Sequence, residues 1–338
     1  MALLMVFAIS CTDGFEELNT PPTSSVTINP GIILAKVQRD GNFLQGNQTA
    51  NCTVGSWIQY WNSSTNLPTS RYVFAHGDWS GYYGNIRNIA QIKNNLLTGQ
   101  ENTKAGRTKL AIAKIVEIDL WQYLTDLFGD IPYSESALGE KNLITQPKYD
   151  TQEFIYNSLI ENLDAAIANL NADDDSYGSY DLYYGGNVSK WIKYANSIKL
   201  RLGMRLKYID PALSKATVEA ALSQPLIASN SDNAMVQTNT DYTSSYNPLL
   251  NHFVGGSSDL RYLAEAIVAQ LVNTNDPRLT MVAAPTATSV KEGTLAYKGK
   301  AVALTDALSV GINNSDYSTC STLTFFSLAY NQAKPIPY

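Results

Sequence analysis

The chain has 338 residues, of which 44% are hydrophobic and 16% are charged, and its formal net charge is -6 at pH 7. This length and hydrophobic content allow a large buried core, and the charged fraction is too low for a disordered protein. Because no dense cluster of Lys and Arg interrupts the acidic balance, composition argues against nucleic acid as a partner.

Cysteine and histidine are too sparse to form a metal-binding motif. The three cysteines are Cys11, Cys52 and Cys320, and the two histidines are His76 and His252. Their separation gives neither the spacing of a zinc site nor a disulfide framework. We therefore expect no metal ion and no cofactor, and the sequence leaves open whether Cys52 and Cys320 pair.

The N-terminus begins with a short apolar run, Ala2 to Ile9, that ends just before Cys11. This run is far shorter than the roughly 20 residues that cross a bilayer, and its length is that of a signal-peptide core without the basic start. With small and aliphatic residues before Cys11, it resembles the lipobox of bacterial lipoproteins. We predict a signal-peptide remnant over residues 1–10, lipidation at Cys11, and an acidic, proline-stiffened tether over residues 11–25.

Aromatic and polar side chains alternate between residues 57 and 83. Sugars expose apolar C–H faces that stack on aromatic rings, and their hydroxyl groups form hydrogen bonds with amide and charged side chains. The alternative is that several of these rings belong to the core. The candidate ligand-binding residues are Trp57, Tyr60, Trp61, Asn62, Trp79, Tyr82 and Tyr83. Trp61 and Trp79 rank first because polar, turn-forming residues surround them.

Two long segments in the middle of the chain have apolar residues at helical spacing. The first runs from Thr108 to Gly129, where the glycine ends the helix. The second begins at Asp150, which we expect to cap the helix together with Glu153, and it continues to Leu170. Each segment predicts an amphipathic helix.

A third amphipathic helix is predicted from Ser189 to Ile209, with Pro211 as its stop signal. Shorter helices are predicted over residues 214–223 and 258–272. The remaining sequence is rich in Thr, Ser and Gly, which predicts loops with a few short strands. Paired helices joined by loops indicate tetratricopeptide-like hairpins, although the sequence has no readable repeat of that kind.

Five segments, in chain order, resemble the SusD/RagB family of outer-membrane lipoproteins. They are residues 11–19 (CTDGFEELN), 124–135 (LTDLFGDIPYSE), 147–156 (PKYDTQEFIY), 181–205 (DLYYGGNVSKWIKYANSIKLRLGMR) and 276–279 (DPRL). The fourth segment is the longest and the most specific. The order of the matches, rather than any one of them, carries the resemblance.

The resemblance implies a mainly α, SusD-like fold of tetratricopeptide-like helical hairpins over residues 26–338, with a loop-rich ligand-binding face. It also implies that the protein sits on the cell surface of a Bacteroidetes-type bacterium, anchored in the outer membrane by its lipid. There it would bind oligosaccharides, or in some members peptides, and deliver them to a SusC-type TonB-dependent transporter. Members of the family continue into further scaffold helices beyond the position of Tyr338, so we expect the C-terminal part of the domain to be missing.

The motifs of common enzymes are absent from the sequence, which contains no G-x-S-x-G, H-E-x-x-H or Walker A pattern. Carboxylate pairs such as Asp126 with Asp130 have the spacing of a solvated helix face. The expectation is therefore a binding protein that is not an enzyme. A glycan-degrading surface lipoprotein and a structural adhesin subunit are the alternatives.

Overall fold

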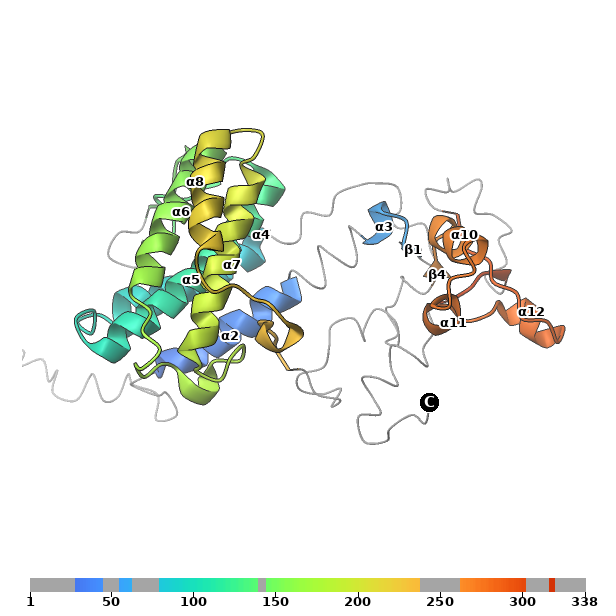
Figure 1. Cartoon of the computed structure of the whole chain (residues 1–338), viewed down its shortest axis with the longest axis horizontal. Coiled ribbons are helices and arrows are strands. Elements are labelled where there is room, and N and C mark those ends of the chain that lie inside the picture. The colour runs from blue at the N-terminus through green and yellow to red at the C-terminus, as the bar shows by residue number, and fades with distance from the viewer. Residues whose placement is uncertain are drawn as a thin grey trace, which may run out of the picture.

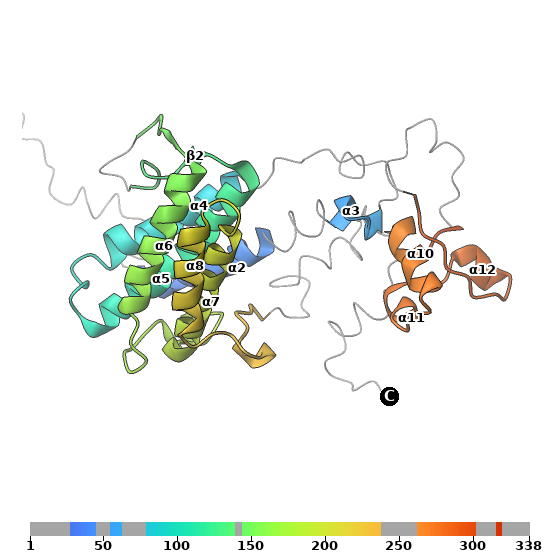
Figure 2. The same cartoon turned by 45° about the horizontal axis from the view of Figure 1, so that its top comes forward.

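The computed structural model describes a mainly α-helical protein (Figures 1 and 2). The described residues are 28–44, 55–62, 79–138, 144–237, 262–301 and 316–319. Cys11, Cys52 and Cys320 lie outside them, so the lipidation site stays a prediction. No helix in the described ranges has both the length and the apolar character that crossing a membrane requires.

Six helices form a bundle in which each helix packs against its neighbours in the sequence. They are α2 (Pro30–Phe43), α4 (Trp79–Gln91), α5 (Lys104–Phe128), α6 (Gln152–Ala168), α7 (Val188–Arg205) and α8 (Pro211–Leu222). A π-helical turn, η3 (Ile92–Leu96), extends α4, and short 3-10 turns, η5 (Gly178–Tyr180) and η6 (Asn230–Asp232), follow α6 and α8. The contacts of α5 with α6 and of α7 with α8 confirm the predicted helical hairpins.

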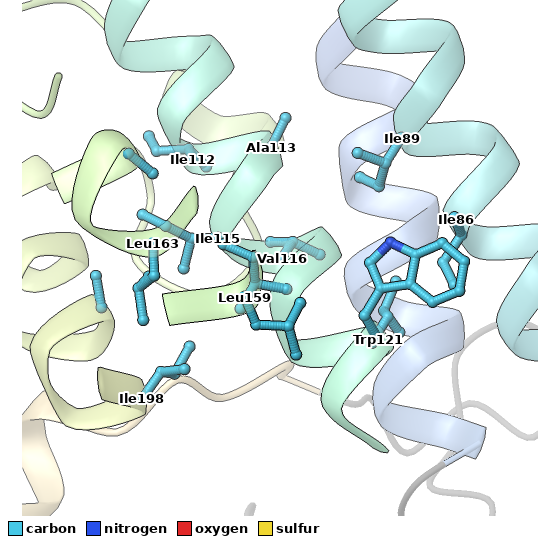
Figure 3. Close-up of a cluster of buried hydrophobic side chains, with 14 of the residues drawn as sticks. Ile86, Ile89, Ile112, Ala113, Ile115, Val116, Trp121, Leu159, Leu163 and Ile198 are labelled. Atoms are coloured by element: carbon cyan, nitrogen blue, oxygen red, sulfur yellow. The ribbon is translucent and has the colours of Figure 1, made fainter. Parts of the chain in front are cut away.

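The core of the bundle is built from aliphatic side chains on the inner stripes of these helices (Figure 3). Helix α5 lies at its centre and contributes Ile112, Ile115 and the buried ring of Trp121. Leu159 of α6 and Ile198 of α7 pack onto the same cluster. Replacing one such buried Leu or Ile with Ala costs about 2 to 5 kcal/mol, so this cluster holds α5, α6 and α7 together.

Two predicted helix starts differ from the structure. Helix α5 begins four residues before Thr108, because Thr103 accepts a hydrogen bond from the backbone N–H of Gly106 and caps the first turn at Lys104. The prediction that Asp150 caps the next helix is wrong. Thr151 is the cap of α6, and Asp150 instead lies in strand β3 (Tyr149–Asp150).

The third predicted helix also ends earlier than expected. Helix α7 ends at Arg205, and Ile209, with 79% of its surface exposed, lies in the turn that follows. Pro211 starts the next helix instead of only stopping the previous one, because Asp210 caps α8. Gly203 allows α7 and α8 to approach closely: a β-carbon there would lie 3.0 Å from Val218 Cγ2.

A smaller group of elements surrounds a two-stranded sheet. Strand β1 (Trp61–Asn62) pairs antiparallel with β4 (Tyr262–Leu263). Because residues 262–263 form this strand, the helix predicted over 258–272 begins only at Glu265. The other elements are α3 (Gly55–Trp57), α10 (Glu265–Asn273), α11 (Leu279–Val282) and α12 (Ala287–Lys291), and a β-bridge joins Ala264 to Lys300.

A buried carboxylate joins α2, α7 and the loop before α7. Asp181 Oδ1 accepts hydrogen bonds from Gln38 Nε2 at 2.8 Å and from the Tyr183 N–H at 3.1 Å. Its Oδ2 accepts from Trp191 Nε1 at 2.7 Å and from the Gly186 N–H at 3.0 Å. Four donors around one buried carboxylate compensate for its lost hydration.

A second buried carboxylate, Glu117 of α5, binds two lysines. Lys93 Nζ lies 2.6 Å from Glu117 Oε2, and Lys114 Nζ lies 3.1 Å from the same oxygen. Burial by itself would raise the pKa of Glu117, but the charges of the two lysines outweigh burial and the pKa is lowered. Glu117 therefore stays ionised and connects the η3 turn to α5.

Candidate ligand-binding site

The predicted ligand-binding residues fall into two groups on different elements. Trp79, Tyr82 and Tyr83 form the beginning of helix α4 in the bundle. The segment from Trp57 to Asn62 instead belongs to the smaller group, where α3 and β1 lie beside β4 (Figure 1). The structure therefore does not combine all seven residues into one site.

In the smaller group, only part of the prediction offers surface to a ligand. Tyr60 has 47% of its surface exposed, and Trp57 is half-buried. Asn62 is buried, and its side-chain amide donates hydrogen bonds to the carbonyl oxygens of Lys300 at 3.2 Å and Ala301 at 2.5 Å. The prediction for Asn62 is wrong in this structure, because its amide binds the backbone. The side chain of Trp61 lies outside the described part.

On α4, the three aromatic residues have different surroundings. Tyr82 is fully buried, with 0% of its surface exposed, and belongs to the core with Ile86. Its ring has no surface to offer a ligand, so the prediction for Tyr82 is wrong in this structure. Trp79 and Tyr83 are half-buried, lie one turn apart, and have ring centroids separated by 5.0 Å. These two rings remain candidates.

Trp79 and Tyr83 border a surface hollow of about 680 Å³, which is within the usual size range of small-ligand sites. One wall is helix α4 with the η3 turn, and the other is formed by residues from 132–138 and 144–147. The hollow is lined by Trp79, Tyr83, Gly84, Arg87, Asn88, Ala90, Gln91, Asn95, Pro132, Glu135, Ser136, Ala137, Leu138, Ile144 and Pro147.

A row of aromatic rings connects the edge of this hollow to the core. The Trp79 ring meets Phe128 edge-on at 5.0 Å, and the Tyr83 ring meets Trp121 edge-on at 5.6 Å. Trp121 in turn meets Tyr133 at 4.9 Å. Edge-to-face pairs of this kind add about 0.5 to 1.5 kcal/mol each beyond burial. The rings at the hollow are therefore held in fixed orientations before any ligand arrives.

The loop wall is held by hydrogen bonds near the base of the loop. Strand β2 (Ile131–Pro132) pairs antiparallel with β3. The Tyr83 hydroxyl donates to the Pro132 carbonyl at 2.6 Å, which joins helix and loop directly. The Glu135 carboxylate accepts from the Lys148 N–H at 2.9 Å. Burial raises the pKa of Tyr83, so its hydroxyl remains a neutral donor at any physiological pH.

Polar side chains complete the hollow next to the rings. Asn88, Gln91 and Asn95 follow one another on α4 and η3 and present amide groups that can both donate and accept hydrogen bonds. Arg87 is exposed and makes no hydrogen bond or ion pair with the described residues. One cation, Arg87, and one anion, Glu135, leave the lining close to neutral. Rings beside amides in a neutral hollow suit an uncharged polar ligand such as a sugar.

Several lining residues were not identified from the sequence. Helix α4 was not predicted, although Ile86, Ile89 and Ile92 have helical spacing and would have indicated it. That helix would have placed Arg87, Asn88, Gln91 and Asn95 together on the opposite, polar face. The position of residues 132–138 and 144–147 beside α4 depends on the β2–β3 pairing, for which the sequence has no local signal. In the described ranges, no cluster of His, Cys, Asp and Glu could hold a metal ion.

The fold places the chain among α-helical proteins built from tetratricopeptide-like hairpins. More specifically, the chain belongs to the SusD-like family: a family model described as "Starch-binding associating with outer membrane" matches residues 22–334. The resemblance to SusD/RagB proteins and the predicted fold class are thereby confirmed. A search of curated protein sequences found no significant match.

Solved structures support the same assignment. A chitin-binding protein is 28% identical, with a TM-score of 0.70 over 88% of this chain and 65% of its own. A SusD homolog from Bacteroides uniformis is 27% identical, with a TM-score of 0.62 over 86% of this chain and 61% of its own. A chitin-binding SusD homolog from Flavobacterium johnsoniae has 22% identity and a TM-score of 0.66, over 87% and 60% of the two chains, and shows likeness of fold. The chain thus spans less than two thirds of these relatives.

Proposed function

We propose that this protein binds a glycan at the cell surface, and that the ligand lies in the hollow beside Trp79 and Tyr83. The observation that carries the proposal is the half-buried Trp79 ring, which packs edge-on against Phe128 and borders a row of amide side chains. A fixed ring loses little entropy when a sugar stacks on it, and the amides can pair with hydroxyl groups.

The proposed ligand is a polymer of N-acetylglucosamine. Two structural relatives, one of them 28% identical, are described as chitin-binding. Each sugar of such a polymer is uncharged, which agrees with the near-neutral lining, and its acetamido group can pair with the amides of Asn88 and Gln91. Binding is proposed to occur without turnover, so that the oligosaccharide leaves unchanged.

The proposal includes delivery of the ligand to a SusC-type TonB-dependent transporter in the outer membrane, with a lipid on Cys11 as the anchor. Membership of a family described as associating with the outer membrane supports this part. Two observations test it: co-purification of a transporter with the full-length protein, and loss of membrane association in Cys11→Ala.

The binding proposal is tested by calorimetric titration with chitohexaose, the hexamer of N-acetylglucosamine. Trp79→Ala should weaken the affinity for chitohexaose by about tenfold. Stacking on one ring contributes up to about 1.4 kcal/mol, which corresponds to a factor of ten in the dissociation constant. Tyr208→Ala is the matched control, because Tyr208 is 87% exposed and lies in the turn after α7, away from the hollow. Equal affinities for the two variants, or release of shorter oligosaccharides during incubation, would contradict the proposal.

A further inference from the structure

A second hollow borders helix α4 on the side that faces α2. It measures about 530 Å³, also within the range of small-ligand sites, and it lies between α4 and the last two turns of α2. It is lined by Lys36, Asp40, Phe43, Leu44, Ser80, Gly81, Gly84, Asn85, Arg87 and Asn88. Three of these residues, Gly84, Arg87 and Asn88, also line the first hollow.

The residue between the two hollows is a glycine with open space above it. A β-carbon built on Gly84 would have no atom within 4 Å. Gly81, one turn earlier, differs: a β-carbon there would lie 2.8 Å from Leu44 Cδ2, so its space is already filled. Helix interiors disfavour glycine by about 1 kcal/mol relative to alanine, and nothing in the packing at Gly84 requires one. Gly84, which lines both hollows, therefore places no side chain between them, and we call this position the saddle.

The second hollow repeats the chemistry of the first. It has an aromatic ring, Phe43, and both hollows share the amide of Asn88, whereas Asn85 is buried. Its acid, Asp40, is paired with Lys36 and with Arg39, so it adds no free negative charge. Arg87, with no hydrogen-bonding partner among the described residues, stands beside the saddle and can donate to a ligand on either side.

We propose that the two hollows form one groove that crosses α4 over Gly84 and holds an extended, uncharged oligosaccharide. This inference rests on the proposed function and adds the ligand's length. A helix with its side chains is about 10 Å wide, so a ligand must extend across that width to fill both hollows. Short oligosaccharides fill only the hollow beside Trp79, and longer ones also reach Phe43.

The test compares two probes, chitobiose and chitohexaose, on the full chain and its variants. Gly84→Leu places a side chain on the saddle, where a β-carbon meets no atom within 4 Å, and Gly84→Ala is the matched control that adds only that β-carbon. We expect Gly84→Leu to lower chitohexaose affinity by about tenfold and to lower chitobiose affinity less, because Gly84 lines both hollows and only the longer ligand must pass over it. Gly84→Ala should weaken chitohexaose binding less than Gly84→Leu does.

A second variant acts in the second hollow alone. Phe43→Ala removes its aromatic ring and should weaken binding of chitohexaose but not of chitobiose. Unchanged chitohexaose affinity in both Gly84→Leu and Phe43→Ala, with Trp79→Ala still impaired, would overturn the inference and leave the proposed function standing. If the parent chain binds neither probe, the proposed function itself fails and the inference with it.

Discussion

Removing the carboxylate of Asp181 should destabilise the bundle more than removing any exposed acid. Asp181→Ala leaves four donors without an acceptor: the Gln38 amide, the Trp191 indole N–H, and the backbone N–H groups of Tyr183 and Gly186. These donors come from α2, α7 and the loop before α7. One substitution therefore loosens three parts of the bundle at once.

The expected cost follows from the number and burial of these bonds. A hydrogen bond to a charged group contributes about 1.5 to 3 kcal/mol, and a buried donor left unpaired costs about 1 to 3 kcal/mol. Relaxation and entry of water keep such losses from adding fully, and removing one partner of a buried charged cluster typically costs 3 to 5 kcal/mol. We expect the free energy of unfolding to fall by about 4 kcal/mol in Asp181→Ala.

Urea unfolding followed by far-ultraviolet circular dichroism measures this loss. The matched control is Asp210→Ala, which removes an exposed helix cap. Within the described ranges its side chain accepts only from the Leu213 N–H, and its loss should cost about 1 kcal/mol. Asp181→Asn should lie between the two, because its single carbonyl oxygen can accept from only part of the donor set. If Asp181→Ala is no less stable than Asp210→Ala, the four hydrogen bonds do not stabilise the bundle as described.

Three further predictions concern the same bundle. Gly203→Leu should lower the free energy of unfolding by about 1 to 3 kcal/mol, because its side chain overpacks against Val218. Gly84→Ala should raise the free energy of unfolding by up to about 1 kcal/mol. Equal melting temperatures for the two variants would contradict the packing described. Glu117→Gln should cost about 3 kcal/mol at neutral pH. The pKa of Glu117 is lowered in the folded protein. The stabilisation that ionised Glu117 provides is therefore complete above pH 4.5, the ordinary pKa of a glutamate, and disappears as the pH falls through the folded-state pKa. The stability difference between Glu117→Gln and the parent chain should therefore shrink in acid, and a difference independent of pH would exclude the Lys93–Glu117 ion pair as its source.

Much of the helical scaffold could be predicted from the sequence, because its signals are local. The apolar spacing in α5, α6 and α7 reflects the face that each helix buries. The exact ends were harder to predict because capping competes between neighbours, as when Thr151 rather than Asp150 caps α6. A one-residue difference in the cap is enough to move Asp150 from a helix into strand β3.

The candidate site was only partly predictable because it depends on contacts distant in sequence. Trp79 and Tyr83 were identified from composition, but so was Tyr82, which the turn of α4 rotates into the core. Asn62 was predicted to bind ligand because aromatic residues lie near it in the sequence. Its hydrogen-bonding partners, Lys300 and Ala301, are distant in the chain. Composition identified the region, whereas only the fold separates rings that face a hollow from side chains that pack inward.

A crystal structure of the protein with chitohexaose tests the proposed glycan site most directly. We expect a sugar ring stacked on Trp79, with the oligosaccharide passing over Gly84 toward Phe43 and accepting a hydrogen bond from Arg87. Oligosaccharide bound instead at the β1–β4 group near Tyr60, with the hollow beside Trp79 occupied only by water, would contradict the proposed site.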